Sequence, residues 1–398
     1  MIEVYAEDAE EAIEAWQEIR GEECTWGGYS KFQIAGLKHF VESSLRLAVR
    51  WKLGVGWYQR SDGRQGYRNG TYRRTLVTPY GTVEIEVPRL REGSYEQGLF
   101  DRNGLLTKEA RELILETYLA GPSTRRVGEV LERVLGYEVS AATVSAICKG
   151  LDELVRRYWS SQIEDKWEYL LLDAIVVRNR AVSRVEKRFV LVAMGVTSDG
   201  LAQVLSFKQA ESEAEVCWQE FVDDLVRRGL EGENLKLVTT DGGPGLVSAV
   251  RTAWPRVPRQ RCWVHKLRNI ACKVKRRNQK ACMDGARLIY MAKTRKDARN
   301  RFFAWRNRWI AEEPKAVACL EKDLEEMLEF LNLPEEHWAA LRTTNRIERA
   351  FREVRRRIRT ISCFTNRRSV DRMIYTIFAY ENRKKEAHYL KRLFTHNT

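Results

Sequence analysis

The sequence predicts an α/β protein with a mixed β-sheet and flanking helices. An all-helical segment interrupts the sheet region, and a mostly helical region with a β-hairpin precedes it. Three observations support this class. Apolar strand-like runs gather between residues 167 and 243, helical periodicity dominates on both sides, and one pair of alternating strands surrounds Tyr80 and Gly81. At 398 residues the chain is long enough for two or three domains with at least one large core.

The N-terminal region, residues 1–106, shows two helical patterns and one pair of strands. Residues 6–17 are helical and acidic, and residues 31–51 form an amphipathic helix. The stretch 54–70 breaks into turns. Alternating apolar residues then predict two strands joined at Tyr80-Gly81, over residues 73–79 and 82–90. A hairpin is therefore expected here, and its role is open.

Residues 107–166 predict a helix-turn-helix-like segment. A helix over 123–135 would be capped by Ser123 and closed by Gly136, and Ser140 would cap a following helix to about residue 155. In a DNA-binding unit the second helix enters the major groove, where Ser140, Thr143, Ser145 and Lys149 would face bases while Arg125 and Arg126 approach phosphate. An ordinary helical hairpin has the same pattern and is commoner, so both interpretations stay open.

The first part of the sheet region, residues 167–265, alternates strands and helices. Four strand candidates cover residues 169–179, 187–200, 201–210 and 235–241, and two helices cover 212–228 and 244–254. Residues 266–340 are almost wholly helical and basic, and residues 341–398 return to the core with a strongly patterned helix over 344–360. We therefore expect an inserted helical domain between two parts of one core.

Positive charge gathers in the C-terminal third. The net charge is +14, with sixteen basic against two acidic side chains over 261–308 and fifteen against five over 345–398. Such a balance favours a polyanionic partner. In residues 301–309 guanidinium groups alternate with Phe and Trp, a composition suited to phosphate contacts and base stacking. A basic helix that packs by its aromatic face has the same composition.

The spacing of the cysteines and the hydropathy of the chain indicate the cellular compartment of the protein. The eight cysteines show no repeated short spacing, so we expect neither a disulfide framework nor a four-cysteine zinc site. The acidic N-terminus lacks the pattern of a signal peptide, and no apolar run approaches the roughly 20 residues of a membrane helix. We expect a cytoplasmic protein with reduced thiols and no membrane partner.

Two aspartates lie where catalytic carboxylates are expected. Asp173 interrupts the apolar strand 170–177, where an uncompensated carboxylate would be costly to bury. Asp241 ends the fourth strand candidate, and the following Gly242 and Gly243 let other groups approach its carboxylate. Taken singly, Asp173 could pair with an arginine and Asp241 could cap the next helix.

Glu348 is the third candidate acid. Ile347, Phe351, Val354 and Ile358 form one apolar stripe of the helix 344–360, and Glu348 lies at the border of that stripe. An arginine row adjoins it on the same helix and includes Arg349, Arg352, Arg356 and Arg359, together with Asn345. A bland alternative is an ion pair from Glu348 to Arg352. Glu353 is the competing acid of this helix and is expected to point further into solvent.

Asp173, Asp241 and Glu348 together form the oxygen-rich set that a two-metal phosphoryl-transfer site needs. Two Mg²⁺ or Mn²⁺ ions per active site are the expected cofactors, because hard cations prefer carboxylate oxygens. No protein nucleophile is required by this chemistry.

Several motifs, in order, resemble the bacterial Mutator-type insertion-sequence transposases. They are LLLDAIVVRNR, the run from VLVAMGVTSDG to DDLVRRGL, LVTTDGGPGLVSAV, RCWVHKLRN and TTNRIERAFREVRRR, and upstream RNGTYRRTLVTPYGTVEIEVPRLREGS and STRRVGEVLE. The resemblance implies an RNase H-like core that carries a DDE triad, here Asp173, Asp241 and Glu348. It also implies an all-helical insertion between the second and third acids, and a prokaryotic protein that acts on the nucleoid.

The family's Cys-x-x-His motif matches Cys262 and His265. One Cys and one His make half a zinc site at best, so support of the active site or packing is favoured over zinc for this pair, and Asn345 is placed in the same supporting group. The Gly-Gly-Pro-Gly turn after Asp241 departs from the family, in which a small residue with His is more usual. This departure puts a His-assisted step at that turn in doubt.

The sequence therefore predicts a DNA transposase that binds terminal inverted repeats, and that cleaves DNA and joins the resulting 3′-OH to target DNA. Its expected partners are double-stranded DNA, both transposon ends and target, and further copies of itself in a homodimer or higher oligomer. Contacts with DNA are expected from Arg346, Arg349, Arg352, Arg355 and Arg356 beside Arg125, Arg126 and Lys149. The alternatives are a nuclease or resolvase that cuts without joining, and a decayed DNA-binding regulator.

Overall fold

The computed structural model describes residues 26–59, 61–95, 105–119, 123–180, 185–359, 364 and 366–396. The chain divides into two compact units, Met1–Lys149 and Gly150–Thr398. Of the sequence-based boundaries, the one after residue 106 lies within the first unit and the one after residue 166 lies within the second. The acidic helix expected over 6–17 lies outside the described residues.

The first unit begins with a long helix packed on a β-hairpin. Helix α2 (Trp26–Leu53) precedes strands β1 (Arg68–Thr78) and β2 (Gly81–Leu90), which pair in antiparallel register. Leu45 of α2 packs with Leu76 and Ile85 in one buried cluster. The predicted hairpin is confirmed, although β1 begins five residues earlier than the alternation indicated.

Three helices follow in the first unit: α3 (Lys108–Leu119), α4 (Thr124–Leu135) and α5 (Ala141–Lys149). The predicted caps are present. The Ser123 hydroxyl accepts a hydrogen bond from the Arg126 amide, Gly136 closes α4 at φ +58°, and the Ser140 hydroxyl accepts one from the Thr143 amide. These caps fix where the turn between α4 and α5 begins and ends.

The helix expected from Ser140 to about residue 155 is instead two helices. Helix α5 ends at Lys149, and α6 (Leu151–Ser160) begins after Gly150. Glycine is a poor helix former because it loses the most backbone freedom, so an interruption at this residue has a simple cause. The continuous apolar pattern hid the break.

A glycine in α4 allows the close approach of α4 to the segment before α5. A Cβ on Gly128 would lie 2.3 Å from the backbone oxygen of Val139. Gly36 in α2 offers a control, because a Cβ there would meet no atom within 4 Å.

We expect Gly128→Ala to lower the free energy of unfolding of the first unit by about 2 kcal/mol, because the added methyl forces the backbone apart. Gly36→Ala should instead raise it by up to about 1 kcal/mol through helix propensity. Urea unfolding of both variants, followed by circular dichroism, measures the difference. Equal effects of the two substitutions would show that the close contact is unimportant.

The second unit is built on a five-stranded mixed sheet. Its strands are β3 (Tyr169–Arg180), β4 (Val185–Val196), β5 (Ala202–Ala210), β6 (Leu237–Thr240) and β7 (Arg259–Arg261), in the spatial order β5-β4-β3-β6-β7. The pairs β3–β4 and β4–β5 are antiparallel, while β3–β6 and β6–β7 are parallel. The predicted α/β class with a mixed sheet is confirmed. Strand β7 was not predicted, because three residues are too few to show a period.

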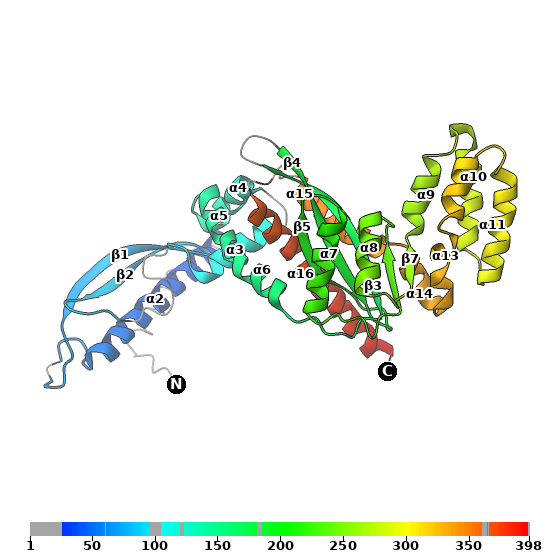
Figure 1. Cartoon of the computed structure of the whole chain (residues 1–398). Coiled ribbons are helices and arrows are strands. Elements are labelled where there is room, and N and C mark those ends of the chain that lie inside the picture. Colours follow the sequence, from blue (N-terminus) through cyan, green and yellow to red (C-terminus); the bar gives the residue numbers. More distant parts are fainter. Residues whose placement is uncertain are drawn as a thin grey trace. The chain divides into compact units, whose positions relative to one another are not determined.

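Helices cover both faces of this sheet (Figure 1). On one face, α7 (Glu215–Arg227) and α8 (Pro244–Ala253) bury a shared core with Leu170 and Leu172 of β3. On the other face, α15 (Asn345–Ile358) contacts β3 and α16 (Arg367–His396) contacts β5. Because side chains alternate along a strand, Asp173 faces the side of α15.

A helical region joins β7 to α15. It consists of α9 (Trp263–Ala271), α10 (Arg276–Tyr290), α11 (Arg295–Trp309), α12 (Pro314–Glu321), α13 (Leu324–Met327), the 3₁₀ helix η1 (Glu329–Asn332) and α14 (Glu335–Leu341). These helices have a hydrophobic core of their own, and α10 and α11 run side by side in the yellow part of Figure 1.

The aromatic side chains of residues 301–309 belong mainly to that core. Phe302, Trp305 and Trp309 are buried in it, whereas Arg301 pairs with Asp297 on its own helix. Of the two interpretations of this segment, the basic helix packed by its aromatic face is therefore the one the structure adopts.

Candidate active site

Asp173 lies on the central strand, next to the strand that leads to Asp241. The parallel register pairs Leu171 of β3 with Thr239 of β6. Continued by two residues, this register brings Asp173 level with Asp241, which directly follows β6. Both aspartates therefore lie where the two parallel strands end their pairing, level with the carboxyl end of β6, and α/β proteins place their sites at the carboxyl ends of strands.

The Asp173 carboxylate is buried, and only one of its two oxygens accepts a hydrogen bond. Its Oδ1 accepts a hydrogen bond of 2.8 Å from the Ala174 amide, while Oδ2 is buried without a hydrogen-bond partner. Burial raises the pKa of this carboxyl to about 6, against the opposing charge of His265, and the nearby charge of Asp241 adds to the rise. A buried acceptor without a donor is costly, so stability does not explain a carboxylate at this position.

Asp241 is held by the glycine turn that follows it. Its Oδ1 accepts a hydrogen bond of 2.8 Å from the Gly243 amide. Gly242 has φ +85°, and its carbonyl accepts a hydrogen bond of 2.7 Å from Nη2 of Arg261. A Cβ on Gly242 would lie 1.8 Å from Nε of Arg261, so no other residue fits without displacing that guanidinium.

Glu348 reaches the site from the first turn of α15. The predicted stripe is present: Ile347, Phe351 and Val354 are buried, and Ile358 is half-buried. The Glu348 carboxylate lies 3.8 Å from Nη1 of Arg268 on α9 and 3.4 Å from Nη1 of Arg355. These arginines, rather than Arg352, are its ion-pair partners in the structure.

Glu353 was expected to point further into solvent than Glu348, and this was wrong. Both side chains are 22% exposed. Glu353 differs in its partners, because it pairs with Arg356 and Arg357 on its own helix, and these interactions lower its pKa to about 2. It has no part in the carboxylate group of the site.

His265 and Cys262 complete the site from α9. Cys262 is fully buried at the N-terminus of α9, and its Sγ accepts a hydrogen bond of 3.3 Å from the amide of Thr344, which precedes α15. Burial alone would raise the pKa of this thiol, but the hydrogen bond and charge of His265 outweigh it and lower the pKa. The same hydrogen bond raises the pKa of His265 to about 9 against the effect of burial, with further contributions from Asp173 and Asp241.

Asp173, His265 and Glu348 form a group that can hold a cation. One ligand atom from each lies within 4.8 Å of the others. Asp241 stands outside this group, yet its charge raises the pKa of Asp173, of His265 and of Glu213. The structure thus brings Asp173, His265 and Glu348 together directly, with Asp241 beside them.

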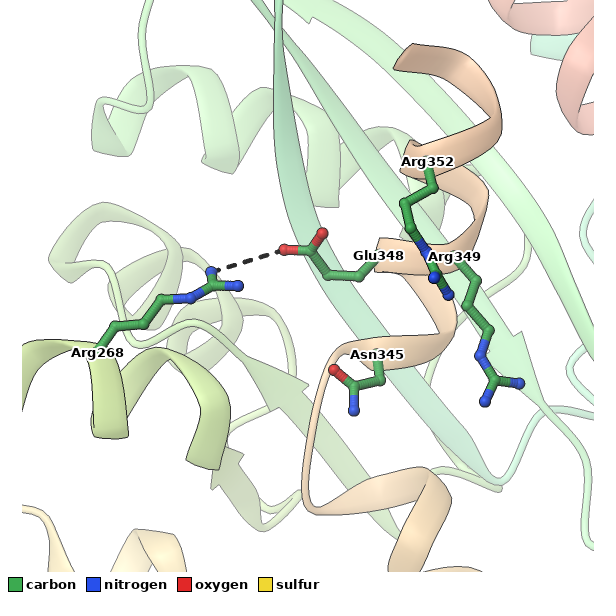
Figure 2. A pocket seen from close by; sticks show the side chains of 5 residues that line it. All are labelled: Arg268, Asn345, Glu348, Arg349 and Arg352. Carbon is green, nitrogen blue, oxygen red and sulfur yellow. Dashed lines mark ion pairs between the residues drawn. The ribbon is translucent and has the colours of Figure 1, made fainter. Parts of the chain in front are cut away.

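A basic cavity of about 290 Å³ opens next to Glu348. Figure 2 shows Arg268 reaching from α9 toward Glu348, while Asn345, Arg349 and Arg352 line the cavity from α15. Arg346, in contrast, donates to the Gly200 carbonyl, and Arg356 pairs with Glu353. Of the arginines predicted for phosphate contacts, Arg349 and Arg352 are the two that line this cavity.

The residues of the first unit that were predicted to contact DNA lie on α4, on α5 and directly before α5. Arg125 and Lys149 are exposed, and Arg126 pairs with Glu129 at the surface. Ser140 and Thr143 hydrogen-bond to each other at the start of α5. Recognition of DNA by this segment stays a prediction.

Two residues of the site were missed by the sequence analysis. Arg268 follows His265 by three positions and so shares its helix face, a spacing that could have identified it. Glu213, in the loop before α7, carries a pKa raised first by burial and then by Asp241, and nothing in its local sequence indicates this position.

A family model described as "Transposase, Mutator family" matches residues 6–387. The chain belongs to the Mutator family of transposases. Among curated relatives, it is 34% identical to the transposase for insertion sequence element ISRM5 of Rhizobium meliloti, over 85% of this chain and 84% of that protein. It is also 36% identical to the transposase for insertion sequence element IS406 of Burkholderia multivorans, over 86% and 88%.

A third relative is the transposase for insertion sequence element IS256 in transposon Tn4001 of Staphylococcus aureus, 34% identical over 80% of this chain and 81% of that protein. The predicted family and the predicted function, an insertion-sequence transposase, are confirmed. Within the described residues, no helix combines the length and apolar character needed to cross a membrane.

Replacement of Asp173 should stabilise the metal-free protein at neutral pH. A pKa raised from 3.8 to about 6 means that the ionised carboxylate destabilises the fold above pH 6, by a penalty on the order of 3 kcal/mol, and that this penalty vanishes below about pH 4. Asp173→Asn should therefore raise the melting temperature in EDTA at pH 7.5, and raise it less at pH 4.5. An unchanged or lower melting temperature at pH 7.5 would contradict this.

Gly242→Ala should destabilise the protein more than Gly200→Ala. The two glycines have nearly equal positive φ, +85° and +87°, but a Cβ on Gly200 meets no atom within 4 Å. Gly200→Ala then costs about 1 kcal/mol for the left-handed backbone alone. Gly242→Ala should cost at least about 1 kcal/mol more, because it also displaces the Arg261 hydrogen bond. Thermal melts of both variants measure this, and equal costs would count against the contact.

Proposed function

We propose that this transposase cleaves and joins DNA with Asp173, Asp241 and Glu348 as the ligands of two divalent metal ions. The observation that carries the proposal is the buried Oδ2 of Asp173, an acceptor with no hydrogen-bond donor, which faces the same side of the sheet as Glu348. Carboxylate oxygens are the ligands that Mg²⁺ and Mn²⁺ prefer. The residues present therefore fit such ions, and zinc is not favoured by this set.

The finer fold assignment is part of the same proposal. The strand order β5-β4-β3-β6-β7, with β4 antiparallel to both neighbours and β6 and β7 parallel to β3, supports an RNase H-like core. The separate hydrophobic core of the helices between β7 and α15 supports an inserted helical domain.

When bound, the ions would lower the pKa of the attacking hydroxyl and neutralise charge on the leaving oxygen. In the first reaction a water oxygen attacks a phosphorus at the transposon end, the bond from phosphorus to the 3′ oxygen breaks, and a 3′-OH is released. In the second, that 3′-OH attacks a phosphorus of target DNA and forms a new phosphodiester bond. The bond from that phosphorus to the 3′ oxygen of the target strand breaks, and the target segment on the 5′ side leaves with a free 3′-OH. No covalent bond to the protein forms in either step.

The surrounding side chains have positioning roles in this proposal. His265 interacts with Cys262, which raises its pKa, and its Nε2 lies 4.0 Å from the Glu348 carboxylate, so it would orient the carboxylate from α15. Cys262 is engaged by His265 and by Thr344, which favours a supporting role for it over metal ligation. Arg268, Arg349 and Arg352 line the cavity beside Glu348 and would contact the phosphates that flank the scissile bond.

Single alanine replacements of Asp173, Asp241 and Glu348 test the assignment. Each should reduce Mg²⁺-dependent nicking and strand transfer by at least about 10³-fold while binding to transposon-end DNA survives, because the acids hold the ions and not the duplex. Gel assays measure the two steps separately, nicking with an uncut end duplex that has flanking DNA, and strand transfer with a precut end duplex that carries a 3′-OH and a target plasmid.

Glu353→Ala is the matched control, since Glu353 is on the same helix, is equally exposed and also pairs with two arginines. It should keep nearly full activity. Joining at the wild-type rate by any of the three variants would refute that ligand, and cutting without joining by the wild type would replace the transposase mechanism with that of a nuclease.

A further inference from the structure

Most of the arginines in the helical region are neutralised by acids within that region. Glu325 pairs with Arg295 and Arg299, and Glu321 pairs with Arg306. These exposed pairs stabilise little, but they occupy the guanidinium groups. The raw excess of positive charge over 261–308 therefore overstates what is free to bind an anion.

One basic pocket in this region is not neutralised. It measures about 770 Å³, lies between α9 and α12, and is lined by five basic side chains and a single acidic one, Asp323. Asp323 already pairs with Lys266 and, at 2.6 Å, with Nη1 of Arg261. Its charge is consequently not available to offset the other bases of the pocket.

The three remaining bases are Lys273, Lys315 and Lys322. All are exposed, and within the part of the chain that the structure describes none of them takes part in an ion pair. Three unpaired ammonium groups around one concavity repel each other unless an anion lies between them. Lysine is suited to hold a phosphate as a point charge without fixing its orientation.

Helix α9 separates this pocket from the candidate active site. His265 and Arg268 lie on the face that meets Glu348, whereas Lys266 and Asn269 lie on the face that lines the pocket. Residues three apart share a helix face, which accounts for both pairs. At its floor the pocket also includes Arg261, whose guanidinium holds the turn after Asp241.

We propose that the pocket between α9 and α12 is a phosphate subsite that holds the backbone of the DNA strand at a distance from the reacting bond. This rests on the proposed function, because it takes the substrate of the site across α9 to be DNA. The subsite contributes affinity and register and reads no bases, since point charges on phosphate carry no sequence information. Its ligand is the phosphodiester backbone, not a free phosphate or nucleotide.

The test is the triple variant Lys273→Ala/Lys315→Ala/Lys322→Ala. Binding of a fluorescent transposon-end duplex in EDTA is measured over a salt series, so that no chemistry contributes. We expect affinity to fall at least about 10-fold at 0.1 M salt and the slope of log K against log salt to become shallower by about 1 to 3, near 0.9 for each lost phosphate contact.

The matched control is Lys280→Ala/Lys293→Ala/Lys296→Ala, which removes the same charge from exposed lysines of the same helical region outside the pocket. It should change the slope much less. Equal changes in the two triple variants would overturn the proposal, because the effect would then follow from net charge alone.

A cysteine in the pocket gives a local readout. Cys272 lines the pocket and is exposed, so an alkylating reagent should reach it in the free protein. The end duplex should slow its modification at least 5-fold, as measured by mass spectrometry of the peptide. Inorganic phosphate at the same phosphate concentration should not, and equal protection by it would overturn the assignment to DNA.

The two proposals fail separately. If the pocket variant binds DNA like the wild type while Asp173→Ala abolishes strand transfer, the subsite is refuted and the function stands. If the pocket variant loses salt-dependent affinity while all three acid variants still join DNA, the subsite stands and the metal assignment is refuted.

Discussion

The parallel pairing of β3 with β6 is the constraint on which the site depends. It brings Asp173 level with Asp241, and the pairing of β3 with β4 keeps Asp173 in the middle of the sheet. Neither aspartate would meet the other through local sequence, since β4, β5 and α7 lie between β3 and β6 in the chain. Once they are adjacent, α15 adds Glu348 and α9 adds His265 from further along the chain. The sheet thus determines the site, and the helices complete it.

The buried carboxylate of Asp173 lowers the stability of the fold. Asp173 lies among apolar neighbours, with one oxygen lacking a hydrogen-bond donor and its pKa raised by burial. Evolution toward stability alone would remove such a group. Its presence in the centre of a well-packed sheet makes Asp173 a candidate functional residue on physical grounds that are independent of any family relationship.

How far the sequence could predict this structure depended on the range of the interaction. Asp173 and the stripe of α15 were predictable because burial and helix period are local patterns, and so were the caps at Ser123 and Gly136. The ion-pair partners of Glu348 were not predictable. Arg268 lies 80 positions earlier in the chain, and it forms an ion pair with Glu348 that Arg352, one helical turn away, does not form. Strand β7 gave no pattern at all, since its pairing with β6 is set by the sheet. Likewise, the pairing of α11 arginines with later glutamates is invisible to a count of charge along the chain.

Asp323 links the helical region to the turn that follows Asp241. Its carboxylate comes from the last part of the helical region, yet it fixes Arg261, which in turn supports the carbonyl of Gly242 beside Asp241. The helical region is therefore not a detachable module. A truncated chain that joins β7 directly to α15 would lose Asp323, the ion-pair partner of Arg261. The turn after Asp241 would then lose the support of a fixed Arg261, even though every strand of the sheet is kept.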